Sequence, residues 1–150
     1  MSASEAQAAV EGLTFARFYT HAGMVGYQGE KMSKSKGNLV LVSRLREAGV
    51  DPMAIRLALL AHHYRADWEW ADADLSDAEN RLTRWRAAVD SASREQAEGL
   101  VHAVRAALAD DLDAPGALEV VDDWAAGERG DGSGAALVRA LLDARLGLTL

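Results

Sequence analysis

Apolar residues recur at helical spacing along the C-terminal half of the chain. They follow one another at intervals of three and four residues, which places them on one face of an α-helix. Four such stripes are present: Leu75, Ala78, Leu82, Trp85 and Val89; Ala97, Val101, Val104, Leu108 and Leu112; Leu118, Val121 and Trp124; and Leu137, Leu141, Leu142 and Leu146. Amphipathic helices must cover one another's apolar faces, and short connections favour antiparallel neighbours. The pattern therefore predicts a bundle of about four or five helices.

Residues with capping preferences indicate where further helices begin and end. In "DPMAIRLALLAHH", Asp51 is placed to cap a helix and Pro52 occupies its first position, where a missing N–H breaks no helical bond. We expect Gly49 to end a short helix over "SRLREA", and Asp113 to cap the helix that follows it. The segment "GERGDGSG", residues 127–134, predicts a flexible polar linker.

The first forty residues show a different pattern, in which strand and turn signals replace most of the helical spacing. "SEAQAAVEG" predicts a short helix ending at Gly12, and the aromatic, partly alternating segment from Phe15 to Val25 predicts a strand. Gly26 and Gly29 flank "YQ" and predict a turn. One or two strands cannot close a sheet alone, so we expect this section to belong to a larger domain.

Composition narrows the classes of protein to consider. Apolar residues make up 49% of the chain and charged residues 26%, as in ordinary globular proteins. The absence of cysteine excludes disulfides and cysteine-ligated zinc within this chain. A formal net charge of −7 argues against an extended nucleic-acid surface. Because the chain shows neither a signal peptide nor an apolar run of ~18 residues, we expect a cytoplasmic protein without membrane contact.

One short segment, "GEKMSKSKGN" at residues 29–38, gathers positive charge and hydroxyl groups in this acidic chain. A triphosphate attacked at its α-phosphorus develops negative charge on the pyrophosphate leaving group, which lysines can stabilise. Lys31 and Lys34 would supply that charge, and Ser33 and Ser35 hydroxyl donors. From the bare pattern of lysines and serines, a solvated surface loop is the better explanation, because a cluster of charges usually lies on the surface.

The complete string "KMSKS" followed by "KGN" resembles the second signature of class I aminoacyl-tRNA synthetases, where this loop stabilises ATP during aminoacyl-adenylate formation. The matching positions are Lys31, Met32, Ser33, Lys34 and Ser35. The resemblance implies that Lys34 and Lys31 act in catalysis and that all five positions contribute to ATP binding. It also implies that the backbone of Val25, at the end of "HAGMV", lies against the adenosine.

The resemblance implies a mostly α-helical fold in two parts. Residues 1–42 would form the C-terminal edge of a Rossmann-like catalytic domain, with a strand and the "KMSKS" loop. Residues 43–150 would form the helical bundle domain, with its linker at about 127–134.

Three further segments, "HAGMV", "LLAHHYRADWEW" and "ADDLDAPGAL", resemble the cysteine-activating branch of this superfamily. That branch holds cysteinyl-tRNA synthetase and the ligase that joins cysteine to glucosaminyl-inositol in mycothiol biosynthesis. Lys36, where the synthetase usually has leucine, favours the ligase family, as do "LLAHHYRADWEW" and the final "LLDARLGLTL".

The ligase resemblance implies a two-step reaction. Cysteine and ATP give cysteinyl-AMP and pyrophosphate, and the amine of glucosaminyl-inositol then attacks the activated carbonyl to form an amide. The expected partners are therefore ATP, L-cysteine and glucosaminyl-inositol, with tRNA disfavoured, and the complete enzyme is expected to be monomeric.

Two parts of the family's machinery are absent from this sequence. It has no "HIGH"-type nucleotide motif and no zinc-binding cysteines. We therefore expect a C-terminal fragment that is inactive alone, acts with the N-terminal catalytic portion of its parent enzyme, and holds no metal. Zinc is expected only in that parent.

Two alternatives stay open. The chain could be a fragment of cysteinyl-tRNA synthetase, with the same chemistry and tRNA as acceptor. It could also be a non-enzymatic helical interaction module whose loop is a relic.

Other polar residues suit structural roles. We expect His62 and His63 to pack between domains, as we expect of Trp68 and Trp70, whereas His21 could equally approach a nucleotide or lie on a strand surface. The acidic residues of "ADDLDAP", which are Asp110, Asp111 and Asp113, suit helix capping better than cation binding. We expect His102 to be a solvated helix residue.

Overall fold

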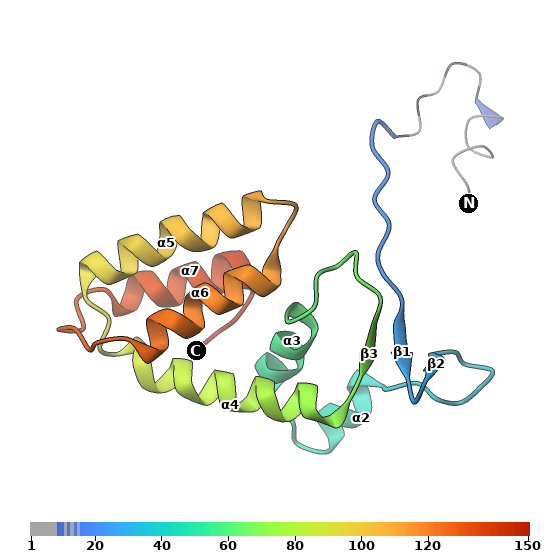
Figure 1. Ribbon diagram of the computed structural model, residues 1–150, viewed down its shortest axis with the longest axis horizontal. Helices are drawn as coiled ribbons and strands as arrows, with labels where there is room; N and C mark the ends of the chain where they lie inside the picture. The colour runs from blue at the N-terminus through green and yellow to red at the C-terminus, as the bar shows by residue number, and fades with distance from the viewer. Residues whose placement is uncertain (1–8, 11, 13, 15) are drawn as a thin grey trace.

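The computed structural model describes residues 9, 10, 12, 14 and 16–150, and Figure 1 draws the others as a thin grey trace. The helix expected to end at Gly12 falls mainly outside the described residues, so it stays a prediction. Among the helices of the described part, none has the length and apolar content needed to cross a membrane.

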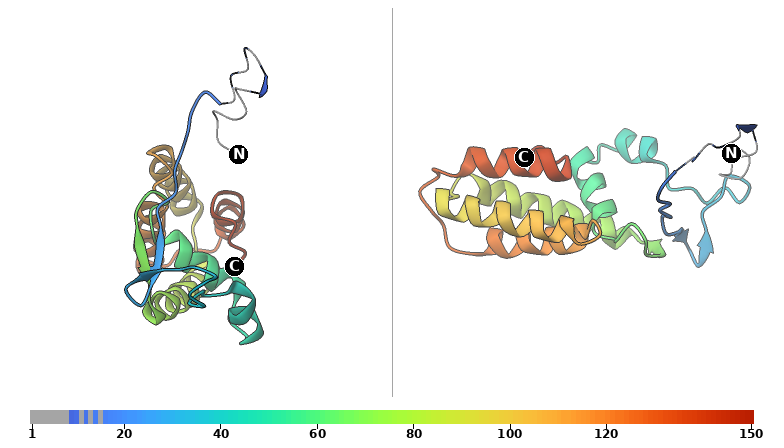
Figure 2. Two further views of the ribbon diagram at one scale, coloured as in Figure 1. Left: turned by 90° about the vertical axis from the view of Figure 1, so that its right-hand side faces the viewer. Right: turned by 90° about the horizontal axis from the view of Figure 1, so that it is seen from above.

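Six helices follow one another from residue 42 to the C-terminal region. Their bounds are α2 Val42–Glu47, α3 Pro52–Leu60, α4 Asp72–Val89, α5 Arg94–Ala109, α6 Ala114–Ala126 and α7 Ala135–Leu146. The four longer helices α4 to α7 lie side by side as a bundle, and α3 packs against α4 (Figures 1 and 2). The mostly α-helical fold and its bundle are therefore confirmed.

Three short strands form a small sheet beside the bundle (Figure 1). Their bounds are β1 Val25–Tyr27, β2 Glu30–Lys31 and β3 Trp68–Trp70, in the order β2-β1-β3. β1 and β2 form an antiparallel hairpin with Tyr27 opposite Glu30. β3 runs parallel to β1, with Gly26 opposite Glu69. Residues well beyond position 42 thus complete the sheet, while the division into two domains stays a prediction.

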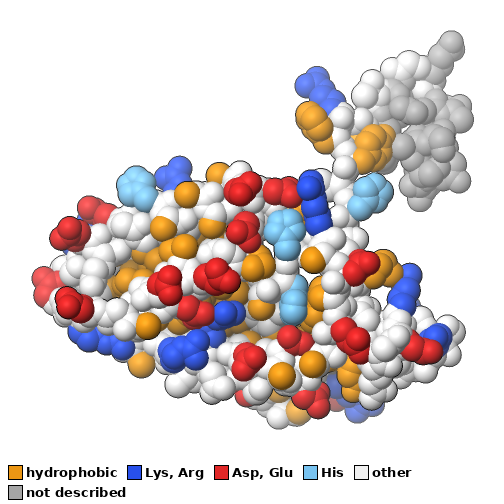
Figure 3. Space-filling model, viewed as in Figure 1, with side chains coloured by type: hydrophobic (Ala, Val, Ile, Leu, Met, Phe, Trp, Pro, Cys, Tyr) orange, Lys and Arg blue, Asp and Glu red, His pale blue; other side chains and the backbone are white. Residues whose placement is uncertain are grey.

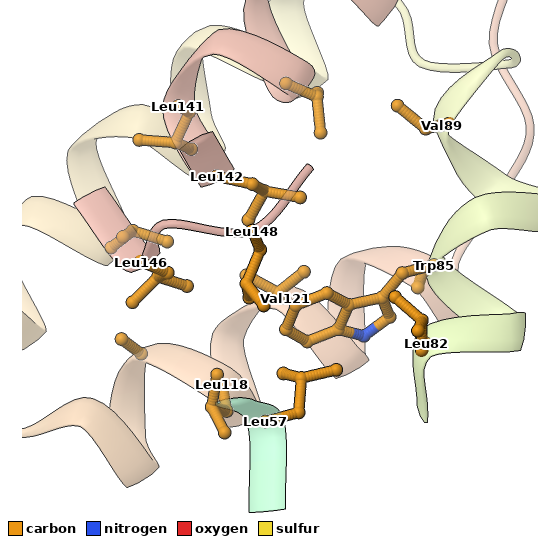
Figure 4. Packing of buried hydrophobic residues seen from close by; sticks show 14 of the residues in the cluster. Leu57, Leu82, Trp85, Val89, Leu118, Val121, Leu141, Leu142, Leu146 and Leu148 are labelled. Atoms are coloured by element: carbon orange, nitrogen blue, oxygen red, sulfur yellow. The ribbon is translucent and has the colours of Figure 1, made fainter. Parts of the chain in front are cut away.

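The hydrophobic core lies inside the bundle around a fully buried tryptophan, Trp85 of α4. Figure 4 shows its indole among Leu57 of α3, Val121 of α6 and Leu148, which follows α7. The indole N–H donates to the carboxylate of Asp122 at 2.8 Å, so its one polar atom is satisfied. The predicted apolar stripes therefore meet in a single core.

The helix caps lie where the sequence predicts them. Asp51 accepts a hydrogen bond from the Met53 N–H at 2.8 Å at the start of α3. Asp113 accepts one from the Gly116 N–H at 2.9 Å at the start of α6. Such caps satisfy amide groups that have no partner within the helix.

The strand predicted between Phe15 and Val25 is wrong for the described residues before Val25. β1 begins only at Val25, and the chain before it is irregular, with Phe18 88% exposed. A strand needs a neighbour to pair with, and among the described residues of this segment hydrogen bonds to another segment begin at Gly23. Phe18 and Tyr19, the described aromatic residues of this segment, therefore do not form a buried face.

Three smaller expectations also need correction. Leu112 does not continue the apolar stripe of α5: that helix ends at Ala109, and Leu112 is 62% exposed. Helix α3 ends at Leu60, so His62 and His63 lie in the irregular segment between α3 and β3. The segment 127–134 does join α6 to α7, but its Gly130 and Gly134 amides donate to the α4–α5 turn at 2.6 and 2.8 Å, which holds it in place.

Candidate functional site

The lysine-rich loop leaves the sheet at the end of β2 and returns to α2. Lys31 is the last residue of β2, and residues 34–37 form a turn in which the Gly37 N–H donates to the Lys34 carbonyl at 3.2 Å. The side chain of Asn38 closes the loop: it accepts from the Ser33 N–H at 2.9 Å and donates to the Lys31 carbonyl at 3.4 Å. Asn38, the last residue of the segment "GEKMSKSKGN", thus joins the two ends of the loop.

The chain's three lysines all lie in this loop, but they differ in their surroundings. The Lys36 ammonium contacts the Glu30 carboxylate at 2.6 Å. Lys31 and Lys34 are exposed, and neither forms an ion pair with a residue that the structure describes. The charges of the two lysines predicted to act in catalysis are therefore available to an anion, whereas the charge of Lys36 is paired with that of Glu30.

The hydroxyl groups of the loop lie close to each other. The Ser33 and Ser35 oxygens are 3.3 Å apart, with the side chain of Ser35 exposed. Lys34 lies between them in sequence, so this part of the loop carries two hydroxyl groups and a positive charge, which suit phosphate oxygens.

Two predicted nucleotide-binding residues are partly buried where the loop joins the sheet. The Val25 carbonyl accepts from the Met32 N–H at 3.3 Å. The Met32 side chain packs toward the core and lines an apolar hollow with Trp68 and Trp70. Met32 therefore anchors the loop, while the exposed lysines point away from the core.

Strand β3 contributes to this site in a way that was not predicted from the sequence. Asp67 accepts from the Met24 N–H, and Glu69 from the Gly29 N–H, each at 2.6 Å. These carboxylates thus bind the hairpin just before β1 and at its turn. The alternation in "DWEW" was the available signal, because it places the two acids on one face of β3 and Trp68 and Trp70 on the other.

The segments "HAGMV" and "LLAHHYRADWEW" meet in a close backbone contact. The Gly23 N–H donates to the Tyr64 carbonyl at 2.7 Å. A Cβ atom at position 23 would lie 2.0 Å from the carbonyl oxygen of Ala66, so only glycine fits there. This contact sets β1 beside β3 and explains the glycine of "HAGMV".

The two adjacent histidines connect the strands to the helices. His62 stacks on Trp68 with ring centroids 3.7 Å apart, and its Nε2 lies 3.3 Å from the Asp74 carboxylate of α4. His63 Nε2 lies 3.1 Å from the Asp111 carbonyl. Figure 3 shows histidine side chains where helices and strands meet. These contacts agree with the predicted packing role.

Asp111 also links "LLAHHYRADWEW" to "ADDLDAPGAL". Its carboxylate accepts from the Tyr64 hydroxyl at 2.9 Å and contacts the Arg65 guanidinium at 2.8 Å. The capping role predicted for these acids thus holds for Asp113, whereas Asp111 contacts another segment. Asp110 and His102 are exposed, as is His21, and within the described ranges no group of three or more His, Asp or Glu residues could hold a metal ion.

Comparison with known proteins places the chain in a family. The family described as tRNA synthetases class I (C) catalytic domain matches residues 2–80. Three similar proteins are each named L-cysteine:1D-myo-inositol 2-amino-2-deoxy-alpha-D-glucopyranoside ligase. The protein of Catenulispora acidiphila is 67% identical over 84% of this chain and 30% of its own length. Those of Streptomyces scabiei and Kribbella flavida are 60% and 57% identical over 100% of this chain and 38% and 37% of their own lengths.

The chain therefore spans between 30% and 38% of the length of these relatives. The family match runs from the front section through β3 and into α4, and so includes the loop, its hairpin and the third strand. On this match, the chain belongs to the class I (C) tRNA synthetase catalytic domain family.

Proposed function

We propose that this chain is the C-terminal part of an ATP-dependent ligase that joins L-cysteine to the amine of glucosaminyl-inositol through a cysteinyl-adenylate. The names of its relatives supply the substrate class. The single structural observation that carries the proposal is the difference among the three lysines: Lys31 and Lys34 are exposed and unpaired among the described residues, whereas Lys36 is held by Glu30.

In the first step, the cysteine carboxylate attacks the α-phosphorus of ATP, the bond to the β-phosphate breaks, and pyrophosphate leaves. Lys34 holds the developing negative charge most directly, and Lys31 assists. Ser33 and Ser35 donate hydrogen bonds to the phosphate oxygens, and Met32 fixes the loop to the sheet. The backbone at Val25 faces the adenosine.

In the second step, the sugar amine attacks the carbonyl of cysteinyl-AMP, and AMP leaves as the amide forms. The residues that bind cysteine, the sugar and zinc belong in this proposal to the preceding part of the enzyme, since this chain contains no cysteine. The chain alone would accordingly not complete the reaction.

The proposal is tested in a chimera in which this chain replaces the matching residues of the Streptomyces scabiei ligase. Lys34→Ala should lower kcat/KM for cysteine-dependent ATP–pyrophosphate exchange by about 10²- to 10³-fold, comparable to losing another preorganised charge donor. Lys36→Ala is the matched control: it removes the same side chain two residues away, and losing an exposed ion pair should change the rate by no more than about fivefold.

Undiminished exchange by Lys34→Ala would show that the loop is inert and would favour the interaction module. Because the matched family is one of tRNA synthetases, the same chimera should also be offered tRNA. Transfer of cysteine to tRNA instead of glucosaminyl-inositol, with a steep dependence of binding on salt, would replace the proposed acceptor.

A further inference from the structure

The amide of Gly29 lies at the tip of the β1–β2 hairpin and has a partner from a third strand. Gln28 and Gly29, the two turn residues, have φ angles of 56° and 77°, as a tight two-residue hairpin turn requires. The outer residues of such a turn bond to each other, which leaves the amide of the second turn residue without a partner in the hairpin. Glu69 supplies that partner at 2.6 Å.

Gly26 gives the Glu69 side chain room to reach the turn. The two residues lie opposite each other in the parallel pair of β1 and β3. A Cβ atom at position 26 would lie on the side of Glu69, in ordinary van der Waals contact at 3.8 Å from the Glu69 Cβ and 3.4 Å from the Glu30 carbonyl oxygen. Because glycine has no side chain, the Glu69 carboxylate can lie across β1 and meet the Gly29 amide.

The two faces of β3 hold the loop in different ways. On one face, Trp68 and Trp70 line an apolar hollow with Met32. On the other face, Glu69 binds the turn that comes two residues before Lys31. Glu69 and Lys31 also line an open hollow of about 430 Å³. The position of Lys31 is therefore set from both faces of a strand that lies nearly forty residues later in the sequence.

We propose that Glu69 is a positioning residue for the lysine loop: its carboxylate fixes the hairpin turn so that Lys31 and Lys34 meet the phosphates of ATP. Glu69 does not touch the nucleotide in this proposal, which rests on the proposed function. Asp67 plays a lesser part, because its partner, the Met24 amide, precedes β1 and lies farther from the lysines along the chain.

The geometric half of the proposal can be tested on the chain itself, without any activity. In Glu69→Ala, the Gly29 amide should exchange its hydrogen with solvent about tenfold faster, as followed by NMR, because its acceptor is gone. Glu69→Gln keeps an acceptor oxygen and should restore most of the protection. Glu119→Ala removes an exposed carboxylate of α6 and is the matched control, with no expected change at Gly29.

The functional half is tested in the chimera. Glu69→Ala should lower kcat/KM for ATP in pyrophosphate exchange by about tenfold, since a small displacement of a binding group is costly to the reaction. The KM for cysteine and the midpoint of urea unfolding should stay unchanged, and Glu69→Gln should return the rate to within about threefold of wild type. In a Lys34→Ala background, Glu69→Ala should cause little further loss, because both act through one loop.

The results separate this inference from the proposed function. Faster hydrogen exchange of the Gly29 amide with an unchanged kcat/KM for ATP would overturn the positioning role. Equal increases in the KM for ATP and for cysteine, together with a lower midpoint of urea unfolding, would also overturn it. Unaltered hydrogen exchange of the Gly29 amide in Glu69→Ala would contradict the hydrogen bond between Glu69 and Gly29. Should Lys34→Ala retain full activity, the proposed function itself fails, whatever the Glu69 variants do.

Discussion

Different interactions stabilise the helical bundle and the strand-and-loop section, which comprises β1, β2, β3 and the lysine-rich loop. In the bundle, buried apolar side chains from the five helices α3 to α7 meet in one core with Trp85, and the caps satisfy the helix ends. In the strand-and-loop section, the three strands formed by described residues are two or three residues long, and single side chains such as Asn38 and Glu69 fix the loop. The bundle therefore supplies most of the stability, and the lysines of the loop that we propose to bind ATP stay exposed.

Removing the indole of Trp85 from the bundle should have the largest effect on the free energy of unfolding. Trp85→Ala leaves a cavity in the core and should lower the free energy of unfolding by about 3–5 kcal/mol, measured by urea unfolding of the chain. Phe18→Ala is the matched control, because that aromatic side chain is 88% exposed and should matter by less than about 0.5 kcal/mol. Equal losses from the two substitutions would contradict a core centred on Trp85.

A smaller effect is expected from the polar partner of that indole. Asp122 accepts hydrogen bonds from Trp85 and Arg81, each at 2.8 Å. Asp122→Ala leaves the buried indole N–H unpaired and should cost about 1–3 kcal/mol, read from the same urea curves. Asp122→Asn retains an acceptor and should lose less; if it is as unstable as the alanine variant, the ion pair and not the buried hydrogen bond matters.

The smallest effect concerns the cap of α3 and depends on pH. The Met53 N–H lowers the pKa of Asp51 below its ordinary value of 3.8, burial opposes this, and Arg86 lowers it further. Since the pKa is lower in the folded protein, the carboxylate's stabilisation is present above about pH 4 and is lost as pH falls through the folded value.

Two substitutions at Asp51 isolate this effect. Asp51→Ala should cost about 1 kcal/mol at neutral pH. Asp51→Asn keeps a good cap but cannot titrate, so its stability between pH 5 and pH 2 should fall less than that of wild type, as measured by thermal unfolding across pH. Parallel pH curves for the two proteins would contradict the assignment.

Local signals predicted much of this molecule. The stripes that include Leu82 and Val121, and the cap at Asp51, depend on neighbours within a few residues, so the sequence displays them directly. The "KMSKS" string likewise marked the loop. Lys36 was read only as a family difference, although Glu30, six residues earlier, pairs with it.

The remaining features depend on contacts between distant segments. The parallel pairing of β1 with β3, the Glu69–Gly29 hydrogen bond and the Asp111 contacts join residues 40 or more positions apart. No local periodicity specifies such pairs. Over the described residues before Val25, the predicted strand is wrong for the same reason, because alternating residues do not form a strand without a neighbour to pair with.

The central claim is that Lys34 and Lys31 hold the phosphates of ATP. Because the chain's three lysines all lie in this loop, every acetylated lysine that mass spectrometry finds in peptides of this chain belongs to the loop. In the chimera, saturating ATP and cysteine should slow acetylation of Lys34 and Lys31 by about tenfold and that of Lys36 by much less. Equal acetylation of all three lysines with and without ATP and cysteine would contradict the account.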